Sequence, residues 1–133
     1  MTTRMGRPLL LALAAILMVA AQPAHATLEA EVEATLSPKV RQRLAAYRVD
    51  AMKGDYRAMR NLGLAWALDA AQEQPKARIV GCAWFIAILE VHKQRADASD
   101  VTHQQEHCAA LNDAQMTEAN GMVQRIKWAT VLR

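Results

Sequence analysis

The chain has 133 residues, of which 22% are charged, with 16 lysines and arginines against 13 aspartates and glutamates. This length suits one domain around a single modest core and argues against several domains. No linker or low-complexity segment divides the sequence, so we expect one folded unit.

The first 26 residues have the layout of a secretory signal. Arg4 and Arg7 precede an unbroken apolar run at 9–21, and a small-residue pattern occupies 24–26. The run has 13 residues, whereas a membrane-spanning helix needs about 20. We therefore expect cleavage after Ala26, a periplasmic or secreted product, and no stable membrane anchor once the signal is removed.

Removal of this segment changes the charge argument. Residues 1–26 hold two of the 16 basic side chains and none of the acidic ones, so the rest of the chain is close to neutral. Binding to nucleic acid through bulk charge loses its main support, and we expect no nucleic-acid partner. A local excess of cations over residues 39–60 is most simply a solvated helix face, with an acidic partner as the alternative.

Residues 27–36 carry alternating glutamates without a strong boundary signal, so we expect a mobile lead-in or a frayed first turn. The main domain is then predicted over 37–133. Ser37 offers an N-cap hydroxyl and Pro38 suits the first helical position. Gly54 is placed to end this helix in the left-handed conformation.

Asp55 is a cap for a second helix, predicted to about residue 71. Gly63 lies inside it, and a glycine costs a helix about 1 kcal/mol relative to alanine. We expect the close approach of a neighbouring helix to offset that cost. The apolar stripe of this helix recurs every four residues, at Ala58, Leu62, Trp66 and Ala70.

A third helix is predicted after Pro75, which suits its first position. It is centred on Trp84 and Phe85 and is apolar nearly all round. A helix without a wide polar face is buried on several sides, so this helix should form the centre of the domain.

Two further helices follow. The first is short and mostly polar, with a cap at Ser99-Asp100 or at Thr102 with Gln105. The last begins after Asn112, with Gln115 completing a capping pair. Its inward stripe is Met116, Ala119, Val123 and Ile126. The chain is thus predicted to be all-α, with about five helices arranged as antiparallel hairpins.

Three stretches resemble one known family. Ala58, Leu62, Gly63 and Trp66 match the first helix of a Sel1-like repeat, a family related to the tetratricopeptide repeats, and residues 81–85 resemble its second helix. The tail at 111–128 is similar to the capping helix of bacterial members. The resemblance covers about residues 54–128 and implies a small exported protein that binds another protein and has no catalytic activity.

In tetratricopeptide-type folds the first helix of each hairpin lines the inner, partner-facing surface. The resemblance therefore implies a contact surface, for which the alternative is an ordinary exposed helix face. Its predicted members are Arg57, Asn61, Leu64 and Leu68.

Cys82 and Cys108 are the two cysteines of the chain. In an oxidising compartment an isolated pair favours a disulfide, with two buried thiols as the alternative. A redox role is disfavoured because the Cys-x-x-Cys spacing is missing.

The histidines suggest a second function. His103 and His107 are four residues apart, hence on one helix face, and His92 lies across the preceding turn. Imidazole nitrogens in such a cluster can bind Zn²⁺ or Cu²⁺, which gives a periplasmic metal-binding protein as the alternative hypothesis. Two solvated histidines on a polar helix are the simpler interpretation.

The sequence offers no catalytic motif. It has no prominent Ser-His-Asp ordering, no glycine-rich phosphate loop and no carboxylate pair in apolar surroundings. We therefore expect neither enzymatic activity nor a cofactor, and another protein as the partner.

Overall fold

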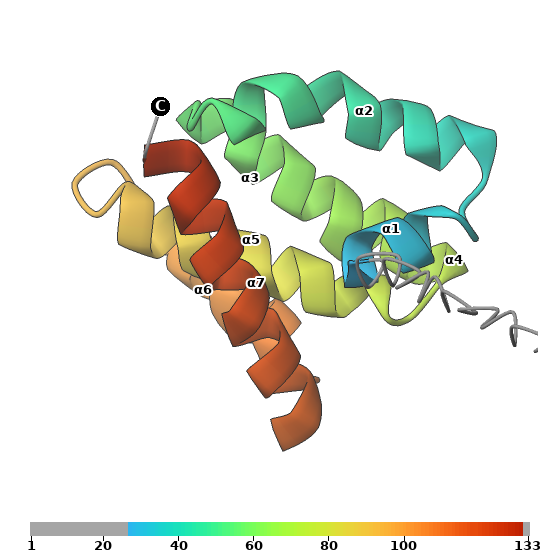
Figure 1. Cartoon of the computed structure of the whole chain (residues 1–133). Helices are drawn as coiled ribbons and strands as arrows, with labels where there is room; N and C mark the ends of the chain where they lie inside the picture. Colours follow the sequence, from blue (N-terminus) through green and yellow to red (C-terminus); the bar gives the residue numbers. More distant parts are fainter. Residues whose placement is uncertain (1–26, 132–133) are drawn as a thin grey trace, which may run out of the picture.

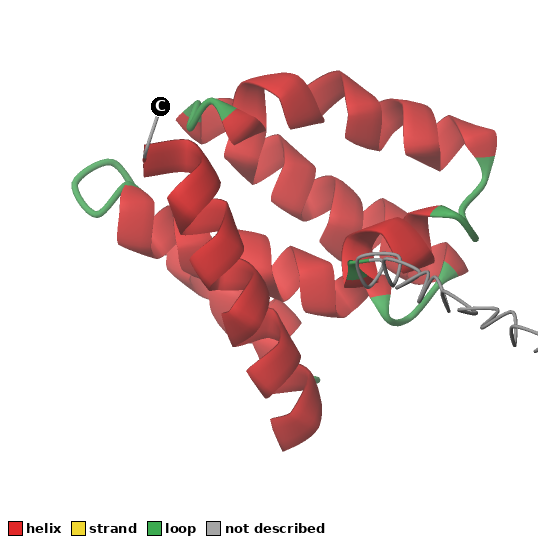
Figure 2. Cartoon of the chain, viewed as in Figure 1, coloured by secondary structure: helices red, strands yellow, loops and turns green. Residues whose placement is uncertain are grey.

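The computed structural model describes residues 27–131. The expected signal and its cleavage site after Ala26 lie outside the described residues. Within 27–131 the fold is all-α, and no strand occurs there (Figure 2). In the same part of the chain, no helix combines the length and the apolar composition that crossing a membrane requires.

The start of the described chain differs from our expectation of a mobile lead-in. Residues Leu28–Glu33 form helix α1, capped by the Thr27 hydroxyl, which accepts a hydrogen bond from the Ala30 backbone. Val32 and Leu36 are buried, with 3% and 4% exposure. These two side chains are four residues apart, and burying both offsets the weak helix signals of the segment.

Helix α2 (Pro38–Met52) begins and ends as the sequence predicts, and helix α3 (Tyr56–Leu64) begins at the predicted cap. Ser37 and Asp55 cap the two helices through their side chains, and Gly54 has a φ of 83° between them. The tight turn makes the helices neighbours that run in opposite directions (Figure 1).

The second predicted helix is longer and less regular than expected. After α3 it passes through a π-helical turn, η1 (Ala65–Ala70), and ends in α4 (Ala71–Glu73). Within η1, Trp66 and Ala67 are buried whereas Leu68 is 49% exposed. The π-helical turn carries no sequence signal that we recognised.

Helix α5 (Ala77–Val91) is the centre of the domain, as predicted. It contacts α1, α3, η1, α6 and α7, and in Figure 1 it runs below α3 and passes behind α7. Trp84 and Phe85 are 1% and 0% exposed, which confirms that they pack between helices.

Helices α6 (Ala98–Ala109) and α7 (Asp113–Val131) complete the described chain. The predicted cap of α6 was wrong, because Asp97, and not Ser99 or Thr102, accepts hydrogen bonds from the first turn. The predicted pair at α7 is confirmed, since Asn112 and Gln115 exchange hydrogen bonds.

Candidate functional site

The predicted contact residues form an open stripe along α3 and η1, called here the α3 stripe (Arg57, Asn61, Leu64 and Leu68). Arg57 and Asn61 are exposed, Leu64 is half-buried, and Leu68 is 49% exposed. The opposite side of the same helical segment packs against α2 and α5. The structure therefore leaves an amphipathic face open here.

A buried polar network, which the sequence did not reveal, joins the start of α3 to the start of α6. Asp100 is fully buried and lies 3.0 Å from the Arg60 Nε. These two atoms are not aligned as a hydrogen bond, so the contact is mainly electrostatic. Asp100 also accepts hydrogen bonds from the Tyr56 hydroxyl and from the Asp97 backbone. Each partner offsets part of the cost of burying the carboxylate.

The Tyr56 side chain is also contacted by residues that follow the end of α5. Burial, together with the hydrogen bond to Asp100, raises the pKa of the Tyr56 phenol. The His92 ring packs edge-on against its ring at 5.5 Å, and the Arg95 guanidinium lies over it at 4.7 Å. The His92 Nε2 is 2.8 Å from the Gly54 carbonyl oxygen, so His92 belongs to this network.

The predicted trio of His92, His103 and His107 is therefore not brought together. Helix α6 instead places Glu106 beside His103 and His107, and one ligand atom from each of these three residues lies within 4.8 Å of the others. The signal was present in the sequence, because the spacing His-x-x-Glu-His also occurs in zinc sites.

The two histidine rings of α6 pack on the central helix. Their planes are nearly parallel at 4°, with centroids 5.7 Å apart, and both rings stack on Phe85 at 5.1 and 5.7 Å. His107 is 7% exposed. Burial, followed by the nearby His103, lowers the pKa of His107.

A disulfide joins α5 to α6 directly beside this cluster. The Cα atoms of Cys82 and Cys108 are 5.0 Å apart and their sulfurs are bonded, which confirms the predicted pair. Cys108 follows His107 in sequence, so the bond fixes this part of α6 on α5. It also means that neither sulfur is available as a thiolate ligand.

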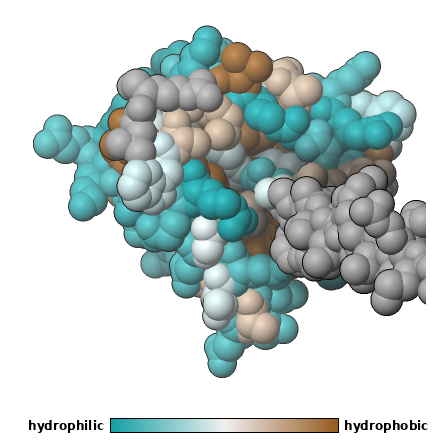
Figure 3. All heavy atoms as spheres, in the orientation of Figure 1, coloured by the Kyte–Doolittle hydropathy of each residue, from teal (hydrophilic) through white to brown (hydrophobic). Residues whose placement is uncertain are grey.

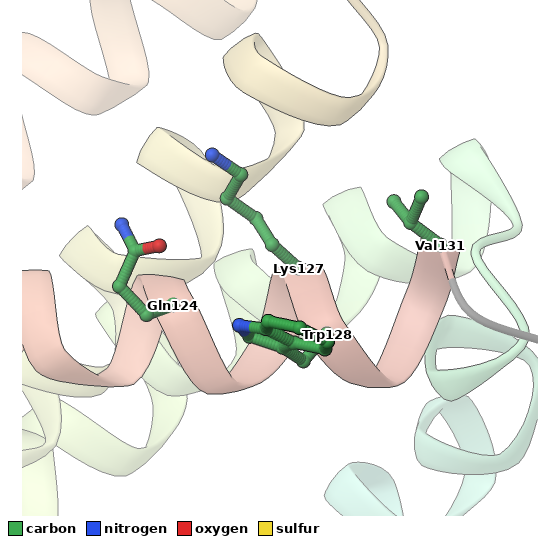
Figure 4. Close-up of a pocket in the computed structure, with 4 residues that line it drawn as sticks. All are labelled: Gln124, Lys127, Trp128 and Val131. Atoms are coloured by element: carbon green, nitrogen blue, oxygen red, sulfur yellow. The ribbon is translucent and has the colours of Figure 1, made fainter.

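A second open surface follows the end of α7. Trp128 and Val131 are 68% and 62% exposed, and with Gln124 and Lys127 they line a shallow hollow (Figure 4). Figure 3 shows hydrophobic surface in the upper part of the view, over α2 and the end of α7. The sequence places Trp128 near the end of the last helix but does not predict its exposure.

Comparisons with known proteins found no matching family model, no similar curated protein and no similar solved structure. The resemblance to Sel1-like repeats stays a prediction from the motifs.

Proposed function

We propose that this protein is exported to the periplasm or secreted, and that it binds another protein through the α3 stripe without catalysis of its own. The observation that carries the proposal is the open amphipathic face formed by Arg57, Asn61, Leu64 and Leu68 on an otherwise packed helical segment.

The composition of the α3 stripe suits a protein interface. Leu64 and Leu68 supply apolar surface, and Arg57 and Asn61 supply donors at one end. Apolar contacts with a polar rim are the usual anatomy of such interfaces, where arginine is enriched. Leu68 also lies in the π-helical turn η1, and such turns are frequent at functional sites.

Two observations support export. The first 26 residues have the order of a secretory signal. The Cys82–Cys108 disulfide is of a kind that persists in oxidising compartments and is rare in the cytosol.

The test compares partner capture between matched variants of the tagged chain. Arg57→Ala with Leu68→Ala removes the side chains at the two ends of the α3 stripe and should reduce capture of a specific partner at least about tenfold. Val101→Ala removes an exposed apolar side chain of α6, 41% exposed, and should leave capture unchanged.

A third variant separates the two open surfaces. Trp128→Ala should leave capture intact if the α3 stripe is the interface. Loss of capture in Trp128→Ala alone would move the interface to α7 and remove the α3 stripe from consideration. Circular dichroism of each variant should show unchanged helix content, because every mutated side chain is exposed. These side chains are Arg57, Leu68, Val101 and Trp128.

A further inference from the structure

We propose that His103, Glu106 and His107 form a binding site for Zn²⁺ on helix α6. This inference goes beyond protein binding and rests on a different helix from the α3 stripe. It also replaces the ligand set expected from the sequence, because Glu106 takes the place of His92.

The helix itself gathers the three side chains. Residues three and four apart are neighbours on an α-helix, and these positions are i, i+3 and i+4 within Ala98–Ala109. One ligand atom from each residue lies within 4.8 Å of the others. Bonds of about 2.0–2.2 Å to one tetrahedral ion would bring the atoms to about 3.3–3.6 Å of one another. Glu106 is exposed.

Two imidazole nitrogens lack a partner in this cluster. His103 Nδ1 and His107 Nε2 are both buried and have no hydrogen-bond partner among the described residues. A buried polar nitrogen without a partner costs free energy. No hydrogen bond from the described residues satisfies these two nitrogens. A coordinate bond to a metal ion would do so.

The electrostatics of the cluster suit a dication. A histidine binds a metal ion as a neutral imidazole, so the two histidines add no charge of their own to the site. The Glu106 carboxylate supplies one negative charge. The positive charge of Arg78 disfavours a cation at His107. Arg78 is exposed, however, so solvent screens its charge.

The ligand set fits Zn²⁺. Two imidazoles and a carboxylate match the protein ligands of open zinc sites, in which water or an external group takes the fourth position. Softer ions that require thiolates are disfavoured, because both cysteines are in the disulfide.

The test is isothermal titration of the disulfide-bonded chain with ZnCl₂. The wild type should bind one equivalent with a dissociation constant in the micromolar range or below. Glu106→Gln and His103→Gln should each weaken binding at least about tenfold. His92→Gln is the matched control, because His92 lies at Gly54 and Tyr56, and it should leave binding unchanged.

A second measurement guards against unfolded variants. Co²⁺ in place of Zn²⁺ should give visible d–d absorption in the wild type and in His92→Gln, and lose it in His103→Gln, while the circular dichroism of all three stays alike. The absence of binding tighter than 100 µM (about 5.5 kcal/mol) in the wild type would overturn the proposal. Equal zinc affinity in the wild type and in Glu106→Gln would show that Glu106 is not a ligand and would also overturn the proposal.

Discussion

Gly81 on α5 faces Ala67 on η1 so closely that a Cβ at Gly81 would lie 2.6 Å from the Ala67 Cβ and 2.8 Å from its backbone nitrogen. The central helix and the π-helical turn therefore meet backbone to backbone. Gly63 makes a second, looser approach, in which a Cβ would meet the Phe85 ring at 3.1 Å.

The first prediction contrasts two glycine substitutions in helices. Gly81→Ala should lower the free energy of unfolding by about 2 kcal/mol or more, because the backbone of Ala67 has to move. Gly121→Ala on α7 meets only the Arg125 side chain at 4.0 Å and should raise it by about 0.5–1 kcal/mol through helix propensity. Urea denaturation measures the change in the free energy of unfolding for both variants. Changes of the same sign and size would contradict the close contact at Gly81.

The second prediction concerns the ion pair between buried Asp100 and Arg60, whose side chain is 28% exposed. Asp100→Ala should lower the free energy of unfolding by about 3 kcal/mol, because it leaves Arg60 without its charge partner and the Tyr56 hydroxyl without its acceptor. Asp69→Ala removes the partner of Arg43 from an ion pair in which both side chains are exposed to solvent. This change should lower the free energy of unfolding by less than about 1 kcal/mol. Thermal denaturation compares the stabilities of the two variants. Similar losses of stability would contradict the claim that Asp100 stabilises the fold through Arg60 and Tyr56.

The third prediction concerns the disulfide. Cys82 and Cys108 are separated by 26 residues, and closing a loop of that length stabilises the folded chain by about 3.5 kcal/mol in the chain-entropy model. The Cys82→Ala, Cys108→Ala double variant should lose stability of that order in urea denaturation. A mass increase of about 2 Da in the wild type on reduction confirms that the bond is present before the comparison.

The fourth prediction is a pH dependence centred on Glu29. Its carboxylate accepts a hydrogen bond from the Trp84 indole at 3.3 Å, and burial raises its pKa above the ordinary value of 4.5 even though that hydrogen bond acts in the opposite direction. The folded state therefore retains a proton that the unfolded state has already released. Stability contributed by protonated Glu29 is full below pH 4.5 and is lost as the pH rises through the folded pKa.

Unfolding of Glu29→Gln between pH 4 and 7 measures this effect. The wild type should lose stability relative to Glu29→Gln as the pH rises, because glutamine keeps an acceptor for Trp84 and carries no charge. Glu31→Gln, at an exposed position on the same helix, is the control for the loss of one carboxylate from α1. A constant difference for Glu29→Gln would show that Glu29 is not buried against Trp84.

Much of the fold follows from local signals in the sequence. The caps at Ser37, Asp55 and Asn112 and the left-handed Gly54 depend on a few neighbouring residues, and the structure bears them out. The central position of α5 follows from its apolar composition, because a helix without a polar face must be covered.

Features that depend on contacts distant in sequence were not predictable. The burial of Asp100 is set by Tyr56 and Arg60 on α3, about 40 residues away. The helical state of α1 depends on a core that takes up Val32. His92 looks equivalent to the other histidines in sequence, but the turn after α5 directs it to the Gly54 carbonyl oxygen.

The central claim is that the α3 stripe is the surface that meets a partner, and site-specific photo-crosslinking tests it most directly. A photoreactive amino acid at Leu68, and in parallel at Val101, is introduced into the chain expressed in cells that export it. We predict a discrete cross-linked protein adduct from position 68 and none from position 101. Adducts of equal yield from both positions, or no adduct from position 68, would contradict the account.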